Sequence, residues 1–359
     1  MPGLYIHIPF CGKKCPYCNF YSVPHSAGAA ASYAGMLAEQ VKALEPEFST
    51  VYVGGGTPSV LDVNSLGRIL GASKKAMNGE GEFTVEVNPE SVDRDKLRLF
   101  LDNGVNRVSV GAQSFNDKKL RTLGRIHGAR DAERAILASR KAGFKNISVD
   151  LIFGAGEETM TEWRLDLEKA AGFDARHISC YSLTLEKGVN MKTAGDDAMK
   201  DMYEFSVDYL NGRGFCRYEV SNFAEKGFEC RHNMSYWEGE PYAGLGPSAV
   251  SYIGGTRSEN VSDVLEYARR YKEGADLKIS MERLSPLESA KELASVKIRT
   301  TDGIGYDWFR AKTGFDFLEI ESHPLAELLG QGLVDRGASR VCLTRKGFLF
   351  CDSVSEAFL

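Results

Sequence analysis

Three cysteines spaced C-x3-C-x2-C, Cys11, Cys15 and Cys18, lie close together near the N-terminus, and the other five are scattered along the chain. In a reducing compartment such a cluster is more typical of a metal site than of disulfides, and the scattered cysteines are expected to be buried packing residues. A structural zinc site needs four ligands, and His7, the nearest candidate for the fourth, lies in a predicted strand. A cubane held by three thiolates instead leaves one iron open to a small molecule. The spacing therefore favours an oxygen-sensitive [4Fe–4S] cluster over zinc.

The elements that must position these cysteines alternate between strand and helix. Short, mostly apolar runs typical of parallel strands buried on both faces occur at Leu4–Ile8, Thr50–Val53, Phe83–Val87, Arg107–Val110, Ile147–Phe153 and His177–Leu183. Helical stripes lie between strands, one formed by Tyr33, Leu37, Val41 and Leu44 and another by Leu66, Ile69, Leu70 and Met77. Successive right-handed βα units predict an α/β fold, a partial (β/α)6 TIM-like barrel. Chemistry in such folds is found at the C-terminal ends of the strands.

Polar and glycine residues follow the predicted strands, as that architecture requires. The cysteine loop follows the first strand, and Gly54-Gly55-Gly56-Thr57 follows the second, where glycines let backbone groups approach a ligand closely. Glu86 ends the third strand, Gln113 follows the fourth, and Arg125 and Asp150 come further along. A carboxylate suits a ribose diol or an ammonium group, and arginine suits a carboxylate. Taken together, these residues predict a binding site beside the cysteines.

The cysteine motif carries a family resemblance. C-x3-C-x2-C after a first strand, with the aromatic Tyr17 before the third cysteine, resembles the radical S-adenosylmethionine (SAM) superfamily. That resemblance implies that the amino and carboxylate groups of SAM chelate the open iron. It also implies that an electron from the cluster splits the sulfonium bond to give a 5′-deoxyadenosyl radical.

Further segments narrow the resemblance to the oxygen-independent coproporphyrinogen III oxidase group, and they cover nearly the whole chain. The segments are Tyr5–Cys11, Gly54–Ser59, Val110–Phe115, Asp150–Gly154, His177–Glu186 and Tyr218–Ala224. By this resemblance the SAM-contacting residues are Tyr5, Tyr17, Gly55, Gly56, Thr57, Glu86, Gln113, Arg125 and Asp150. No residue is assigned a catalytic role.

Two branches of the group differ in function. The oxidase branch decarboxylates two propionates of coproporphyrinogen and carries a fourth cysteine two residues after the third, where this chain has Phe20. It also has an extension before the first strand, which begins here at about Leu4. Both differences argue against coproporphyrinogen dehydrogenase activity.

The HemW-type haem chaperones, the other branch, bind haem and transfer it to acceptor proteins. Their His-Asn-x-x-Tyr-Trp signature is present as His232–Trp237, so the resemblance implies that His232, Tyr236 and Trp237 contact haem. A histidine can ligate haem iron, and aromatic side chains can line a porphyrin face. A second histidine common in this branch is replaced by Val250, which cannot ligate iron. The alternatives are the oxidase and a radical SAM enzyme for another substrate.

Composition sets the remaining expectations. The 359 residues carry a net charge of −5, so they give no basic footprint for nucleic acid, and no apolar run has signal-peptide or membrane-spanning length. A soluble, cytoplasmic protein is expected. We expect a barrel over 1–250, a connecting segment over 251–284, and a small helical domain with a β-wing over 285–359. The resemblance implies a [4Fe–4S] cluster, SAM and haem as cofactors. The implied partners are an apo-haemoprotein such as a membrane respiratory enzyme and an electron donor such as flavodoxin or ferredoxin.

Overall fold

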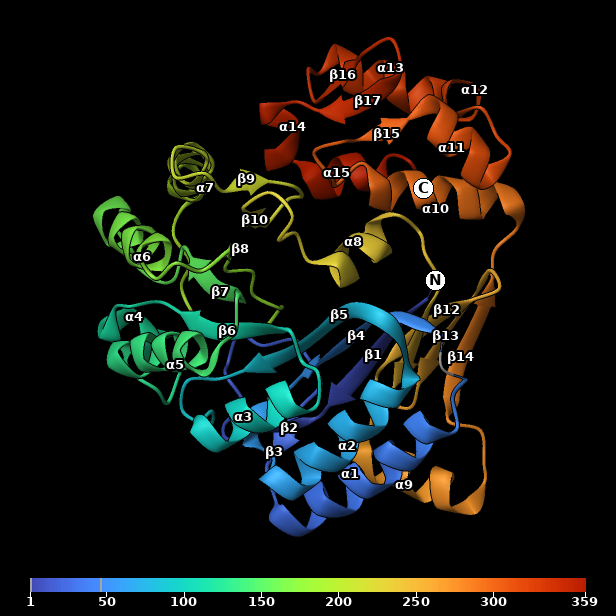
Figure 1. The fold of residues 1–359 in the computed structure, drawn as a ribbon. Coiled ribbons are helices and arrows are strands. Elements are labelled where there is room, and N and C mark those ends of the chain that lie inside the picture. The colour runs from blue at the N-terminus through green and yellow to red at the C-terminus, as the bar shows by residue number, and fades with distance from the viewer. Residues whose placement is uncertain (1, 46) are drawn as a thin grey trace.

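The protein is described by a computed structural model over residues 2–45 and 47–359. Within these residues one sheet of twelve strands contains six parallel strands that pair in chain order (Figure 1). They are β1 (Gly3–Ile8), β4 (Phe48–Gly55), β5 (Met77–Val87), β6 (Arg107–Gln113), β7 (Asn146–Phe153) and β8 (His177–Ser182). All six predicted strands are confirmed. The two outermost strands of the described sheet do not pair with each other, so the barrel is partial.

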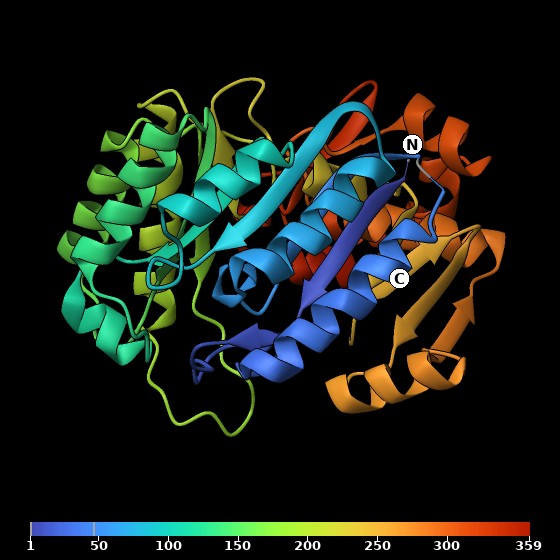
Figure 2. The same cartoon turned by 60° about the horizontal axis from the view of Figure 1, so that its bottom comes forward.

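Helices cover the outer face of these strands (Figure 2). They are α1 (Ala27–Lys42), α2 (Val63–Ala76), α3 (Arg94–Asp102), α4 (Asp117–Thr122), α5 (Ala129–Ala142), α6 (Met160–Gly172) and α7 (Asp196–Asn211). The predicted stripes are buried on α1 and α2, except that Leu44 lies beyond the end of α1 and Met77 begins β5. Gly143 ends α5 in the left-handed conformation, with a φ of 117°, which favours glycine at this position.

The two faces of the parallel strands differ in chemistry. Along a strand, alternate side chains point to opposite faces, and apolar residues such as Val51, Val53 and Val85 pack in the main core beneath the helices. The residues between them are polar and bond to one another, as Tyr52 does with Glu86 across two strands. The inside of the barrel is therefore a polar surface, whereas the apolar core lies outside the sheet.

Additional strands extend the sheet at both edges. Beyond β8 lie β10 (Asn222–Ala224) and β9 (Cys216–Arg217), both antiparallel to their neighbours. Beyond β1 lies β11 (Tyr242–Leu245), which is parallel to it. Three antiparallel strands follow: β12 (Val250–Ile253), β13 (Thr256–Asn260) and β14 (Lys278–Arg283), with α9 (Val264–Glu273) before β14. The segment expected to connect the domains thus continues the main sheet.

The C-terminal residues form a second core. Its helices are α10 (Pro286–Lys297), α11 (Tyr306–Thr313), α12 (Phe317–Ile320), α13 (Ser322–Gly330), α14 (Arg345–Leu349) and α15 (Cys351–Glu356). A small sheet of β15 (Ile304–Gly305), β17 (Arg340–Leu343) and β16 (Val334–Arg336) joins them. The short helix α8 (Arg231–Trp237) lies between this unit and the parallel strands (Figure 1). The division at 250 and 285 remains a proposal, and residues 1 and 46 lie outside the described part.

The scattered cysteines are not all buried. Cys180, Cys230 and Cys351 are buried as predicted, and Cys342 is half-buried. Cys216 is exposed on the edge strand β9, so the prediction of a buried packing role is wrong for this residue. Within the described residues, no helix is both long and apolar enough to cross a membrane.

A buried ion-pair network joins α4 to the chain around α6. The ammonium Nζ of Lys119 lies 2.5 Å from the Glu158 carboxylate and 3.1 Å from the Asp166 carboxylate, and all three side chains are almost completely buried. Asp166 also accepts hydrogen bonds from the Ser114 hydroxyl and the Phe115 N–H. The single cation on α4 therefore compensates two buried carboxylates, Glu158 in the loop after β7 and Asp166 on α6.

Replacing Lys119 by Met is expected to lower the free energy of unfolding by about 3–5 kcal/mol, because it leaves two buried carboxylates without a cation. Urea unfolding of anaerobically prepared protein measures this change. The exposed neighbour Lys118 provides the control, since Lys118→Met is expected to change stability by less than about 0.5 kcal/mol. Equal effects of the two substitutions would contradict the structural role of the network.

Candidate cluster site and adjoining cavity

The cysteine loop is fixed at both ends by the backbone. After β1, β2 (Phe10–Cys11) pairs in parallel with β3 (Val23–Pro24), and the His25 N–H donates to the Cys11 carbonyl at 2.9 Å. Within the loop the Cys18 N–H donates to the Cys15 carbonyl at 3.1 Å. The three cysteines line a cavity of about 450 Å³ at the C-terminal ends of the strands.

Two donors from neighbouring elements face the thiols. The Thr57 hydroxyl lies 3.5 Å from the Cys11 sulfur, and the Arg125 guanidinium lies 3.7 Å from the Cys15 sulfur. Burial raises the pKa of Cys18, and the nearby Cys11 and Cys15 raise it further. A nearby cation and hydroxyl donor would stabilise thiolates, which are the ligand form of cysteine.

His7 does not complete a zinc site. Its Nδ1 lies 3.0 Å from the Tyr5 hydroxyl, and its Nε2 lies 2.9 Å from the Tyr21 carbonyl oxygen, so both ring nitrogens are hydrogen-bonded. Burial lowers the pKa of His7. Among the described residues no three His, Cys, Asp or Glu side chains converge on one metal ion. A cubane does not require such convergence, since each thiolate binds a different iron.

Most of the predicted SAM-contacting residues surround the same cavity as the cysteines. Those that line it are Tyr17, Gly55, Gly56, Thr57, Glu86, Gln113, Arg125 and Asp150. Tyr5 is placed differently: its ring lines a second, larger cavity, with its hydroxyl bonded to His7. The structure therefore brings together all but one of the predicted set.

Glu86 is held where the two cavities meet. Its carboxylate accepts hydrogen bonds from the Tyr52 hydroxyl at 2.8 Å and from the Gly55 N–H at 3.1 Å. Partial burial raises its pKa to about 7, although both hydrogen bonds act in the opposite direction. A side chain at position 54 would meet this carboxyl group, because an added Cβ would lie only 2.8 Å from its carbon. The lack of a side chain at Gly54 thus leaves room for the Glu86 carboxylate in the site.

Asn88, which the sequence did not identify, connects two predicted residues. Its side-chain oxygen accepts from the Arg125 guanidinium at 2.7 Å, and its amide donates to the Thr57 hydroxyl at 2.8 Å. Arg125 also donates to the Gly111 carbonyl at 3.2 Å. In the sequence, only the position of Asn88, two residues after Glu86 and directly before Pro89, could have indicated that it belongs to the site. Asn88 orients the arginine toward the cavity.

The last two predicted residues are constrained by their strands. Gln113 has a φ of 63° at an irregularity in the β6–β7 pairing, and such positive φ values in non-glycine residues cluster at functional sites. Asp150 accepts hydrogen bonds from the hydroxyls of Ser109, Ser148 and Ser179, at 2.8, 2.9 and 2.7 Å. Three adjacent strands therefore fix this carboxylate.

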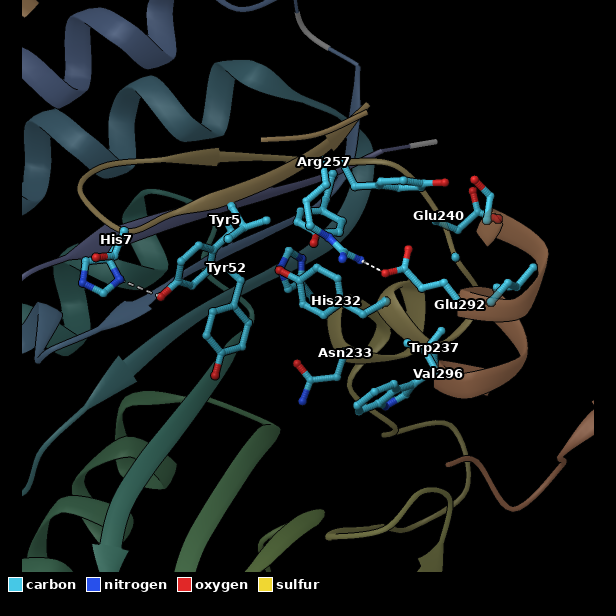
Figure 3. A pocket seen from close by; sticks show the side chains of 18 of the residues that line it. Tyr5, His7, Tyr52, His232, Asn233, Trp237, Glu240, Arg257, Glu292 and Val296 are labelled. Atoms are coloured by element: carbon cyan, nitrogen blue, oxygen red, sulfur yellow. Dashed lines mark hydrogen bonds and ion pairs between the residues drawn. The ribbon is translucent and has the colours of Figure 1, made fainter. Parts of the chain in front are cut away.

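A cavity of about 980 Å³ adjoins the cluster cavity and separates the parallel strands from α10 and α11. Figure 3 shows Tyr5, Tyr52 and His232 on one side of it and Glu292 and Val296 on the other. The signature residues His232, Tyr236 and Trp237 all line it, as does Val250. The residues that line both cavities are Asn19, Phe20, Tyr52, Gly55, Glu86 and Tyr181. Tyr52 and Tyr181, like Asn88, were not identified from the sequence.

His232 is locked in place by hydrogen bonds. Its Nδ1 lies 2.8 Å from the Thr50 hydroxyl, and its Nε2 lies 2.8 Å from the Tyr236 hydroxyl. Its ring stacks on the ring of Tyr52, with 5.2 Å between the ring centroids. Burial, together with the charge of Arg107, lowers its pKa to about 3. Both ring nitrogens already have partners, so iron ligation by Nε2 would require the Tyr236 hydroxyl to move away.

The chain is similar along its whole length to curated bacterial proteins. It is 34% identical over 368 residues to the heme chaperone HemW of Lactococcus lactis, a match covering 99% of this chain and 96% of that protein. The heme chaperone HemW of Bacillus subtilis is 32% identical over 376 residues, covering 100% and 99% of the two chains. The Escherichia coli protein of that name is 31% identical over 373 residues, covering 99% and 98%. The chain belongs to the HemW family.

Domain comparisons agree with this membership. Residues 5–170 match the Radical SAM superfamily, and residues 284–350 match the HemN C-terminal domain. A solved structure of coproporphyrinogen III oxidase (HemN) from Escherichia coli has a TM-score of 0.85 and covers 99% of this chain and 90% of its own, at 21% identity. At that identity the likeness establishes the fold alone. The predicted radical SAM barrel and C-terminal domain are thereby confirmed.

Membership of the radical SAM superfamily implies a [4Fe–4S] cluster and SAM as cofactors. The smaller cavity fits these groups chemically. It offers three thiols without a fourth, an arginine beside the thiols, and two carboxylates, Glu86 and Asp150, fixed by hydrogen bonds.

The low pKa of His232 predicts an acid-dependent loss of stability. The unfolded state binds the proton near pH 6.5 and the folded state only near pH 3, so this contribution is complete above 6.5 and is lost as the pH falls toward 3. His232→Gln should reduce the dependence of unfolding free energy on pH by up to about 1.4 kcal/mol per pH unit. Urea unfolding between pH 7 and pH 4 measures this slope.

The exposed His323 supplies the matched control, since His323→Gln should leave the slope of the native protein unchanged. A slope that is the same in the His232→Gln variant and the native protein would show that His232 is not held in the neutral form.

Proposed function

We propose that the protein is a haem chaperone that holds a [4Fe–4S] cluster and SAM in the smaller cavity and haem in the larger one. Haem would pass from there to an apo-haemoprotein such as a membrane respiratory enzyme. The observation that carries this proposal is the full-length similarity to proteins named heme chaperone HemW, at up to 34% identity. The aromatic cavity beside the cluster site supports it.

Each residue of the smaller cavity has a role in this proposal. Cys11, Cys15 and Cys18 would hold the cluster, which when bound supplies an electron to SAM. Arg125, oriented by Asn88, suits the carboxylate of SAM, and Glu86 suits its ammonium group. Asp150 suits the ribose hydroxyls, because a fixed carboxylate accepts two hydrogen bonds from a diol. Tyr17, Gly55, Gly56, Thr57 and Gln113 would form the remaining wall.

The larger cavity suits a flat, mostly apolar ligand. Tyr5, Tyr52, Tyr236 and Trp237 provide aromatic rings on its wall, and the volume of about 980 Å³ lies at the upper end of small-molecule sites. The hydrogen bonds of His232 favour a role in positioning Tyr236. His232 would contact haem, and ligation of the iron by its Nε2 would first require release of the Tyr236 hydroxyl.

The fold likeness to coproporphyrinogen III oxidase favours a second candidate function, oxidative decarboxylation of coproporphyrinogen. Phe20 opposes it, since this residue stands where the oxidase group has a fourth cysteine, and its side chain lines both cavities. A flavodoxin or ferredoxin would serve as electron donor and the cytoplasm as the location in either case.

The cluster assignment predicts a spectroscopic loss. Cys15→Ser removes one of the three thiolates, so anaerobically reconstituted protein should lose the visible thiolate-to-iron charge-transfer absorption and most of its acid-labile sulfide. Cys216→Ser, which changes an exposed cysteine outside both cavities, should keep both signals. Anaerobic preparations that contain zinc and lack sulfide would contradict the assignment.

The two candidate functions diverge in one assay. Reconstituted protein given SAM, reductant and coproporphyrinogen III should yield no protoporphyrinogen, whereas titration with ferric haem should shift the Soret band in a saturable way. Product chromatography and absorption spectroscopy provide the two measurements. Formation of protoporphyrinogen over many turnovers would favour the oxidase and overturn the chaperone proposal.

A further inference from the structure

Two cationic side chains, Arg257 and Lys312, line the large cavity within the described part of the chain. Arg257 belongs to β13, in the extension of the sheet, and Lys312 belongs to α11 of the C-terminal unit. They therefore reach the cavity from different structural units.

Both cations are paired with a glutamate from the opposing side. The Arg257 guanidinium lies 2.5 Å from the Glu292 carboxylate on α10, and the Lys312 ammonium lies 2.5 Å from the Glu240 carboxylate directly after α8. Figure 3 shows the first pair spanning the space between the β-strand and α10. The Arg257 guanidinium also lies near the phenol of Tyr242, where its charge opposes the rise that burial produces in the pKa of that phenol.

These ion pairs are partly open to water. The side chains of Arg257 and Glu292 are 41% and 20% exposed, and those of Lys312 and Glu240 are 33% and 34% exposed. Ion pairs exposed to this degree stabilise a fold by little, typically less than about 1 kcal/mol. A cation in such a pair can exchange one carboxylate for another at low cost, because the released glutamate remains solvated.

We propose that Arg257 and Lys312 recognise the carboxylate groups of the ligand in the large cavity, and that these groups replace Glu292 and Glu240 as their partners. The inference rests on the proposed function, in which the ligand is a tetrapyrrole with two propionates. Arginine binds a carboxylate through two parallel hydrogen bonds, and lysine binds it as a point charge.

The arrangement gives the ligand an orientation. The macrocycle would lie against the aromatic wall of Tyr52, Tyr236 and Trp237, and the propionates would point toward Arg257 and Lys312. Because the two cations are on different units, a dicarboxylate that binds both also connects the sheet extension to the C-terminal unit.

A structural role and a recognition role of the ion pairs predict different effects of substitutions on the affinity for the ligand. If the pairs only hold the two units together, removal of the cation and removal of the glutamate change the affinity for the ligand in the same direction. If the cations recognise the ligand, removal of the cation weakens binding, whereas removal of the competing glutamate frees the cation and strengthens it.

The test is a titration of the reconstituted protein with ferric haem and, separately, with the dimethyl ester of haem, which lacks the propionate charges. Arg257→Gln and Lys312→Gln should each weaken haem binding about tenfold, a typical loss for a charge-assisted hydrogen bond, and leave ester binding within about twofold. Glu292→Gln and Glu240→Gln should tighten haem binding and leave ester binding unchanged.

Arg345→Gln is the matched control, since Arg345 forms a bidentate pair with Asp208 between α14 and α7, away from the cavity. It should change neither affinity. If Arg257→Gln fails to fold, Arg257→Lys keeps the charge without the planar fork and should lower haem affinity by a smaller factor.

Equal effects on haem and its ester, or changes in the same direction for Arg257→Gln and Glu292→Gln, would overturn this inference and leave the chaperone proposal standing. Failure of the native protein to bind haem at all would overturn both.

Discussion

Charged groups on the inner face of the parallel sheet must find partners inside the barrel, and this constraint shapes everything around the two cavities. The Glu82 carboxylate accepts hydrogen bonds from the backbone N–H groups of Arg231 and His232, both at 3.0 Å. These bonds place the start of α8 against β5. The Glu86 carboxylate accepts hydrogen bonds from the Tyr52 hydroxyl and the Gly55 N–H. Glu82 thus fixes the position of α8, and Glu86 fixes the wall between the cavities.

The helix held in this way gives the His-Asn-x-x-Tyr-Trp signature a structural meaning. The N-terminal end of α8 is bound by a carboxylate, a favourable arrangement for a helix dipole, and His232 then bonds sideways to Thr50 and along the helix to Tyr236. Gly3 leaves room for this ring, since an added Cβ would lie 3.1 Å from it. The signature therefore builds one wall of the large cavity, and Tyr236 and Trp237 are displayed on that wall.

Features with a local signal were predictable, and features that depend on distant pairing were not. The parallel strands have apolar outer residues, and their parallel order then brings Cys11, Glu86 and Arg125 to the same end of the sheet. Strand β14 (Lys278–Arg283) is exposed at every position, so no buried face marks it in the sequence, and its pairing with β13 alone defines it. Asn88 and Tyr52 were missed because their roles come from partners on other elements. The engagement of both nitrogens of His232 is equally non-local.

The wall shared by the cavities has a thermodynamic consequence. Tyr52, Glu86 and Tyr181 face both spaces, so any displacement of these side chains by one ligand changes the surface offered to the other. Linkage requires the resulting coupling to be reciprocal: the factor by which one ligand alters the affinity of the second equals the factor by which the second alters the first. The affinity of one cavity for its ligand would therefore depend on whether the other cavity is filled.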